Sequence, residues 1–219
     1  SSYLMCLLWH SFHLCKRSTD QNTITKIQTR LPELFHIAGL ESSRAGKIGM
    51  EVGSARERIL IALLIYKFGE ANVETKIPIT EPEVDVIVFG RPVSIKTITG
   101  KKLNGVKLIW TVDAEQALKF SQEYHPRGDI LLAQINWNDW GWFFFFPKSA
   151  QIETLQQIGR QNYIKLPKAG TNPRGVEIST EALDLLAGHS QCLNIPINWY
   201  QKQVDYDPYD RWVELWKED

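Results

Sequence analysis

Two short strand-forming runs, separated by a glycine, constrain the fold of this chain most strongly. Val84–Phe89 and Val93–Ile98 are rich in β-branched residues, which favour extended structure. Gly90-Arg91 lies between them and fits a two-residue hairpin loop, because glycine adopts the positive φ that such loops need. With this loop, Asp85 is expected to face Lys96 on the partner strand.

The two faces of this hairpin differ in chemistry. Successive side chains along a strand point to opposite faces of the sheet. One face is therefore expected to be apolar, with Val84, Val86, Val93 and Ile95. The other face is expected to gather acidic, hydroxyl and basic groups, namely Glu83, Asp85, Ser94 and Lys96.

Helical and strand patterns alternate along the rest of the chain. Residues 1–40 have helical spacing with an interruption at Pro32, and residues 40–50 are loop-like. A helix is expected to begin at Ser54 and to end at Gly69. Later strands are expected at 106–112, 130–137 and 142–146, with helices at 113–123, 148–158 and 179–187. This order predicts an α/β (α+β) protein with a mixed central β-sheet flanked by helices.

The length of 219 residues suits one domain of this kind. We find no internal repeat and no linker that would divide the sequence, so residues 1–219 are expected to form a single domain. Residues 1–50 are expected to be a mainly helical and loop extension, 51–147 the core, and 148–219 the C-terminal part of the same domain.

Composition narrows the class of protein. Lys+Arg and Asp+Glu are equal at 25 each, which argues against a protein that coats nucleic acid by charge alone. The three cysteines are far apart, as expected for reduced thiols in a cytoplasmic protein without a zinc site. The apolar run at residues 3–9 is too short to span a bilayer, so no membrane partner is expected.

Asp85, Ser94 and Lys96 have the spacing of a metal-dependent nuclease site. Carboxylates bind Mg²⁺ through hard oxygen ligands, and the metal activates a water molecule and neutralises charge on a phosphate. A neighbouring lysine can orient that water or stabilise the added charge. The alternative is a surface hairpin in which Asp85 and Lys96 form only a cross-strand ion pair.

Glu81-Pro82-Glu83-Val84-Asp85 followed by Ser94-Ile95-Lys96 resembles the motif of the PD-(D/E)xK nucleases, which include most type II restriction endonucleases. In that family the position of Ser94 is held by Asp or Glu. The resemblance therefore implies either that another carboxylate, Glu83 or a helix glutamate, completes the metal site, or that one metal site is weakened. It also implies Mg²⁺-dependent phosphodiester hydrolysis that leaves a 5′-phosphate, with Asp85 on the metal and Lys96 on the attacking water.

Glu57 is the candidate helix glutamate. Many members of this superfamily supply a glutamate from a helix that precedes the first strand of the active site. Glu57, with Tyr66-Lys67-Phe68-Gly69 behind it, resembles that segment in archaeal Holliday-junction resolvases. The alternative for Glu57 is a capping box with Ser54 at the start of the helix.

Three groups of residues are candidate DNA contacts, and each could instead be part of a solvated loop. Basic and hydrogen-bonding residues can contact phosphates or purine edges. The first group follows the catalytic strand and contains Thr97, Thr99, Lys101, Lys102 and Asn104. The second lies in a polar loop and contains Lys168, Asn172 and Arg174. The third is a glycine-flanked loop with Arg44, Lys47 and Met50.

Met50 has a specific interpretation. An exposed methionine can act as a wedge between base steps. In this respect the chain resembles the CGCG-cutting ThaI type of restriction enzyme, in which a methionine intercalates. The alternative is that Met50 packs under the helix that follows it.

The sequence therefore predicts a type II restriction endonuclease that cleaves double-stranded DNA as a homodimer, because a two-fold protein matches a two-fold sequence. A Holliday-junction resolvase or repair nuclease of the same fold is an alternative. A DNA-binding domain whose active site was lost at Ser94 is another. The aromatic run at residues 137–146 is expected to be a buried hairpin or part of a dimer contact rather than a base-stacking surface.

Overall fold

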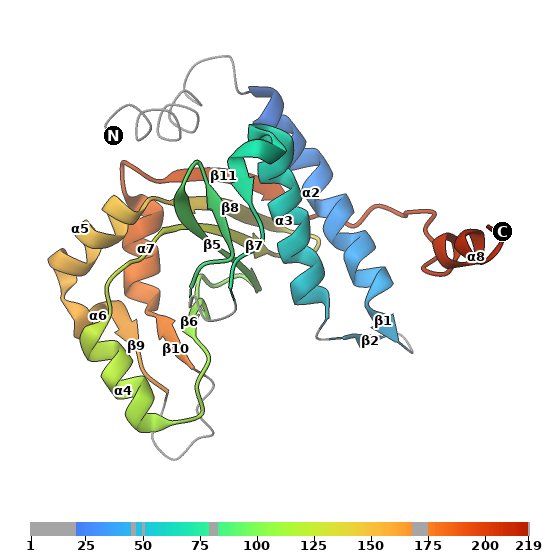
Figure 1. The fold of residues 1–219 in the computed structure, drawn as a ribbon. Helices are drawn as coiled ribbons and strands as arrows, with labels where there is room; N and C mark the ends of the chain where they lie inside the picture. Colours follow the sequence, from blue (N-terminus) through green and yellow to red (C-terminus); the bar gives the residue numbers. More distant parts are fainter. Residues whose placement is uncertain (1–20, 45–46, 50, 79–82, 168–174, 219) are drawn as a thin grey trace.

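A six-stranded sheet in the order β11-β8-β7-β5-β4-β3 forms the centre of the molecule (Figure 1). The computed structural model describes residues 21–44, 47–49, 51–78, 83–167 and 175–218. β5 and β7 are parallel, and the other neighbouring pairs are antiparallel. The expected mixed sheet is thus confirmed. Its strands are β3 (Val73–Glu74), β4 (Val86–Val88), β5 (Arg91–Thr99), β7 (Asp129–Ile135), β8 (Trp140–Phe146) and β11 (Leu193–Asn198).

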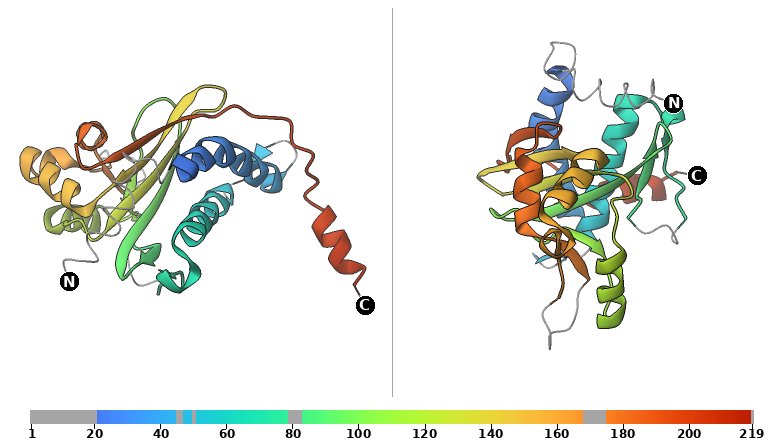
Figure 2. Two further views of the ribbon diagram at one scale, coloured as in Figure 1. Left: turned by 90° about the horizontal axis from the view of Figure 1, so that it is seen from above. Right: turned by 90° about the vertical axis from the view of Figure 1, so that its left-hand side faces the viewer.

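Helices cover both faces of this sheet (Figures 1 and 2). One face is covered by α2 (Gln21–Glu41) and α3 (Val52–Phe68), which also pack against each other. A 3₁₀ turn, η2 (Glu70–Asn72), follows α3. The other face carries α4 (Ala114–Glu123), α5 (Lys148–Ile158), α6 (Arg160–Tyr163) and α7 (Thr180–Gly188). A three-stranded sheet joins them, with β6 (Lys107–Ile109), β10 (Val176–Ile178) and β9 (Ile164–Lys165).

The two central strands β7 and β8 are apolar on both sides because each side meets a separate core. Leu131 and Phe143 belong to the core under α2 and α3. Leu132 and Phe144, one residue further along each strand, belong to the core on the other side. The expected burial of the aromatic run within a hairpin is confirmed for Phe143–Phe146, whereas Trp140 and Trp142 are exposed.

The predicted register of the β4–β5 hairpin was wrong by two residues. Val88 pairs with Arg91, so the loop is Phe89-Gly90 rather than Gly90-Arg91. Both loop residues have positive φ, 49° and 73°, which is the backbone of a type I′ turn. A shift of two residues preserves the faces of a strand, so Asp85 still shares its face with Ser94 and Lys96.

Two expectations about the helices also need correction. α2 runs through the buried Pro32 without interruption, because packing of its apolar face outweighs the one missing N–H donor. α3 begins at Val52, so Ser54 lies inside the first turn and forms no cap; its predicted capping box with Glu57 is absent. Gly69 ends α3 as predicted, with φ of 84°.

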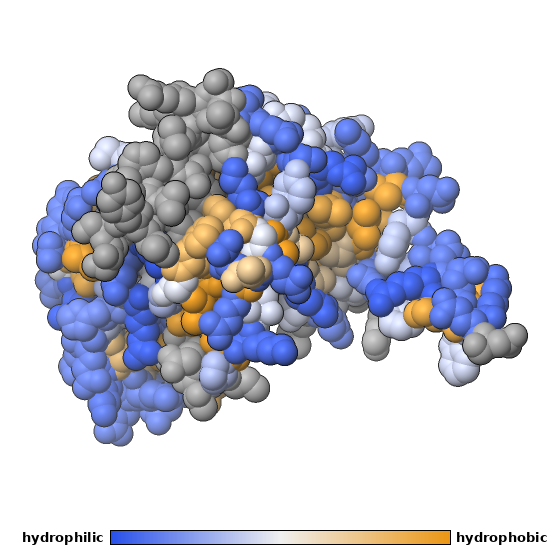
Figure 3. Space-filling model, turned by 45° about the horizontal axis from the view of Figure 1, so that its top comes forward, coloured by the Kyte–Doolittle hydropathy of each residue, from blue (hydrophilic) through white to orange (hydrophobic). Residues whose placement is uncertain are grey.

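The segment before α3 was expected to be a loop but contains a small ribbon. β1 (Ser43–Arg44) pairs antiparallel with β2 (Lys47–Ile48). At the opposite end of the chain, α8 (Asp210–Trp216) projects from the body on an arm without regular structure (Figure 2). Apolar side chains of α8 lie at the surface (Figure 3), and Val213 and Leu215 are nearly half exposed. Within the described ranges, no helix is long and apolar enough to cross a membrane.

Leu131 provides a test of the packing. Its side chain is fully buried on the central strand β7. We expect Leu131→Ala to lower the free energy of unfolding in urea by about 2–5 kcal/mol, because the deletion removes apolar contacts and leaves a cavity. The matched control is Leu118→Ala on α4, since Leu118 is 48% exposed. Equal losses in the two variants would contradict the assigned core.

Candidate active site

The carboxylate of Asp85 is fixed by the first part of β5. Its Oδ2 accepts a hydrogen bond of 2.6 Å from the backbone N–H of Ile95 and one of 3.1 Å from Oγ of Ser94. The last β4–β5 pair is Val86 with Val93, so the N–H of Ile95 lies beyond the paired part of β4. The backbone N–H of Asp85 still donates to the carbonyl oxygen of Val93 at 3.0 Å, and its side chain takes the next donor along β5, the N–H of Ile95.

Ser94 acts on this carboxylate as a hydrogen-bond donor. It is buried, with 4% of its surface exposed, and its Oγ donates to Asp85. A carboxylate at this position would instead place a second negative charge about 3 Å from Asp85, which is costly when both groups are partly buried. Ser94 thus orients the acid beside it.

Glu57 reaches the same place from α3. Burial raises its pKa, and the negative charge of Asp85 raises it further. The positive charge of Lys96 acts in the opposite direction. Since the capping box does not form, the Glu57 side chain is available to the hairpin.

Lys96 lies between two acidic regions. Its Nζ is 3.9 Å from Oδ2 of Asp85, and its charge also acts on Glu83. Burial raises the pKa of Glu83 to about 7, and Lys96 and Arg127 only partly oppose that rise. One carboxylate oxygen of Glu83 is buried and has no hydrogen-bond partner among the described residues.

Glu83 does not join the pair formed by Asp85 and Glu57. Among the described residues, no three His, Cys, Asp or Glu side chains converge closely enough to hold a metal ion. Glu83 itself has a positive φ of 65°, so strand alternation does not extend to it. The structure therefore brings Asp85, Ser94, Lys96 and Glu57 together, while the charge of Lys96 also acts on Glu83.

A cleft of about 830 Å³ opens beside these groups. It is lined by the part of β5 around Lys96 and by Glu57 and Glu83. Residues of β6 and α4, including Lys107 and Lys119, complete the lining. Such a cleft is large enough for a polyanionic backbone segment, and it brings both cations and carboxylates to one place.

Only some of the residues predicted to contact DNA lie near the cleft. Thr97 lines the cleft, Thr99 is exposed at the last position of β5, and Lys102 and Asn104 are exposed in the turn after it. Lys101 forms an ion pair of 3.1 Å with Asp139. The other candidates fall where side chains are not described: the backbones of Arg44 and Lys47 lie in the β1–β2 ribbon, and Met50, Lys168, Asn172 and Arg174 are outside the described residues.

Two cations of the cleft were missed by the sequence interpretation. Lys119 lies on α4, and Arg127 lies just before β7. Neither belongs to a motif, and both are distant in sequence from Asp85. The only available signal was the amphipathic helix that carries Lys119, and that pattern does not predict which way the helix packs.

The comparison with protein families covers nearly the whole chain. The family model "Restriction endonuclease ThaI" matches residues 18–218. The chain belongs to the ThaI family of restriction endonucleases. A comparison with curated proteins gives no match.

A solved structure extends this result. It is described as "Restriction endonuclease in complex with substrate DNA", is 56% identical to this chain, and has a TM-score of 0.84. The similarity covers 94% of this chain and 100% of that chain. This ThaI-family chain is therefore a type II site-specific deoxyribonuclease, which confirms the activity expected from the hairpin.

Glu83 of this ThaI-family enzyme provides a test of the site's electrostatics. In the unfolded chain its pKa returns to about 4.5, whereas the folded value is about 7. Between these values the folded state retains a proton that the unfolded state releases, so stability falls as pH rises and stays reduced above pH 7. We expect Glu83→Gln to raise the free energy of unfolding at pH 8 by roughly 2 kcal/mol and to change it little at pH 4.5.

The measurement is urea unfolding at both pH values. Glu74→Gln is the matched control, because Glu74 is an exposed glutamate on β3. A Glu83→Gln variant that is no more stable than the wild type at pH 8 would contradict the burial of an ionised Glu83.

Proposed function

We propose that this chain hydrolyses phosphodiester bonds of double-stranded DNA with Mg²⁺ as cofactor, leaving 5′-phosphate and 3′-hydroxyl ends. The observation that carries the proposal is the grouping of Asp85 and Ser94 with Glu57 and Lys96, the two of these residues that line the cleft. Membership of the ThaI family supports the same reaction class. The solved relative in complex with substrate DNA supports a double-stranded substrate.

Asp85 and Glu57 fit a divalent cation. Carboxylate oxygens are the ligands that Mg²⁺ prefers. The two groups lie close enough for the charge of Asp85 to raise the pKa of Glu57, and a cation between them would remove that repulsion. When bound, Mg²⁺ would lower the pKa of a water molecule and neutralise charge on the phosphate.

The remaining residues of the site prepare the reaction. The N–H of Ile95 and Oγ of Ser94 hold Oδ2 of Asp85 in place, so its orientation is set before DNA binds. Lys96, only partly exposed beside Asp85, orients the attacking water and places positive charge where the phosphate gains negative charge. Ser94 thus takes a positioning role where the family motif has an acid.

DNA contacts are proposed for the catalytic strand, for the turn after it and for two other segments of the sequence. Thr97 faces the cleft, and the exposed end of β5 leads to the basic turn after it. Phosphate and base contacts are assigned to Thr97, Thr99, Lys101, Lys102, Asn104, Arg44, Lys47, Lys168, Asn172 and Arg174. Met50, just before α3, is assigned the wedge between base steps.

We also propose that the enzyme acts as a homodimer, because cleavage of both strands at a two-fold sequence needs two active sites. Helix α8 supports this arrangement. A helix of seven residues is not stable alone in water, yet none of its residues is buried in the chain. Trp212 and Trp216 are 51% and 89% exposed, so a second copy of the chain would provide the missing contact.

Lys96→Ala tests the catalytic assignment. We expect the variant to bind DNA but to lose roughly 100- to 10,000-fold in single-turnover cleavage with Mg²⁺, because it lacks the group that serves the water. The matched control is Lys76→Ala, since Lys76 is exposed after β3 and outside the cleft. Discrete fragments from a defined DNA, joined again by DNA ligase, would support sequence-specific cleavage with 5′-phosphate ends.

Cleavage by Lys96→Ala at the wild-type rate would contradict this role. Cleavage by the wild type without any divalent cation would contradict the cofactor.

The homodimer predicts a solution mass of about twice 25.2 kDa by light scattering. Replacing both Trp212 and Trp216 by Ala is expected to lower the dimer fraction, because it removes the largest exposed apolar groups of α8. A wild-type enzyme that is monomeric both free and on DNA would contradict the proposal.

A further inference from the structure

Arg127 is a cation of the cleft to which the reaction described above assigns no task. Its side chain lines the main cleft together with Lys96, Glu57 and Glu83. It also lines the small adjoining cavity under Ser94 and Lys96. The two hollows adjoin each other, and Arg127 lines both of them together with Lys96 and Glu83.

Among the described residues, no partner occupies the guanidinium of Arg127. Arg127 is exposed, and within the described part of the chain it forms no hydrogen bond or ion pair. Arg91, at the start of β5, differs in this respect because it is committed to Asp129 at 3.3 Å. The charge of Arg127 does act on Glu83, so it is directed toward the catalytic side of the molecule.

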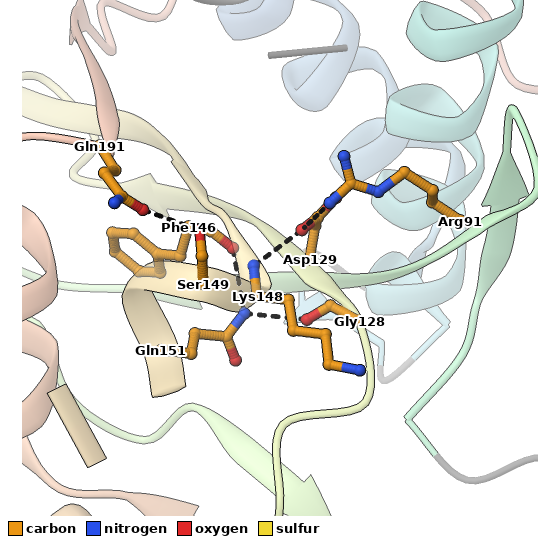
Figure 4. A network of polar contacts seen from close by, with 8 residues as sticks. All are labelled: Arg91, Gly128, Asp129, Phe146, Lys148, Ser149, Gln151 and Gln191. Atoms are coloured by element: carbon orange, nitrogen blue, oxygen red, sulfur yellow. Dashed lines mark hydrogen bonds and ion pairs between the residues drawn. The ribbon is translucent and has the colours of Figure 1, made fainter. Parts of the chain in front are cut away.

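The backbone that carries Arg127 is held rigidly. A side chain at Gly128 would come within 2.3 Å of the carbonyl oxygen of Pro92, so this turn packs directly against the catalytic strand. The buried Gln151 donates to the carbonyl oxygen of Gly128 at 2.9 Å and to that of Phe146 at 3.0 Å (Figure 4).

Asp129 anchors the other side of the turn. Asp129 is 1% exposed, and its carboxylate accepts a hydrogen bond of 2.7 Å from the backbone N–H of Lys148 at the start of α5 (Figure 4). The same carboxylate accepts a second hydrogen bond from the guanidinium of Arg91. Arg127 thus projects from a segment that is fixed to β5, β8 and α5. Such preorganisation is what a group needs if it is to stabilise charge in a reaction.

We propose that Arg127 binds the scissile phosphate from the side opposite Asp85 and Glu57. The guanidinium has parallel N–H donors that match two phosphate oxygens, and its charge does not depend on pH near neutrality. Lys96 and Arg127 would then contact the same phosphate group from two directions. This inference rests on the proposed function, because it requires the phosphate to enter the cleft beside Lys96.

The test compares DNA with a normal scissile phosphate and DNA with a neutral methylphosphonate at that position. Affinity is measured with Ca²⁺ in place of Mg²⁺, for the wild type and for Arg127→Ala. The wild type is expected to lose about 10-fold in affinity on the neutral DNA, whereas Arg127→Ala, already weaker, should lose much less. Single-turnover cleavage of normal DNA by Arg127→Ala is expected to fall roughly 100-fold, with partial recovery in Arg127→Lys.

Arg30→Ala is the control, since Arg30 forms an exposed pair with Glu33 on α2. The proposal would be overturned if the wild type and Arg127→Ala lost the same factor in affinity on the neutral DNA. It would also be overturned if the wild type lost affinity only when the methylphosphonate was placed at a neighbouring phosphate. If the wild type and Arg127→Ala both cleave DNA at the same rate, only the role of Arg127 is refuted. A wild type that does not cleave with Mg²⁺ refutes the proposed function itself.

Discussion

The hydrogen bond from the backbone of Ile95 to the carboxylate of Asp85 is the contact on which the site depends. It joins the end of β4 to the middle of the catalytic strand, where the regular pairing has already stopped. Because an N–H that is fixed in a sheet cannot move far, the carboxylate is held without a second acid. Oγ of Ser94 adds a second donor to the same oxygen. The position of Asp85 in turn determines where Glu57 and Lys96 meet.

Alternate residues of strand β5 have different roles: one set packs in the core, and the other set belongs to the proposed active site. Val93 and Ile95 belong to the core under α2 and α3, while Ser94 and Lys96 line the small cavity that adjoins the cleft. Its parallel partner β7 is buried on both faces, which keeps β5 from shifting. The turn before β7 packs so closely on β5 that only glycine fits at position 128. The same packing brings Arg127 to the cleft.

Features of this enzyme that depend on local sequence patterns could be predicted, whereas features that depend on long-range packing could not. The hairpin, its two faces and the helix bearing Glu57 follow from the spacing of side chains, which has a period of two in strands. The register was missed because Phe89, rather than Arg91, adopts positive φ beside Gly90, a choice that sequence preferences disfavour. Arg127 was missed because its place depends on how the start of β7 packs against β5, and no local pattern encodes that contact. Glu83 was expected beside Asp85, but its positive φ breaks the strand alternation on which that expectation relied.

The proposed reaction requires Asp85 and Glu57 to hold the catalytic cation together. Anomalous scattering from Mn²⁺ in crystals of the Lys96→Ala variant bound to its DNA would locate this cation. We expect a Mn²⁺ peak within about 2–2.5 Å of a carboxylate oxygen of both Asp85 and Glu57. A DNA-bound complex in which Mn²⁺ binds elsewhere, or in which neither carboxylate contacts the ion, would contradict it.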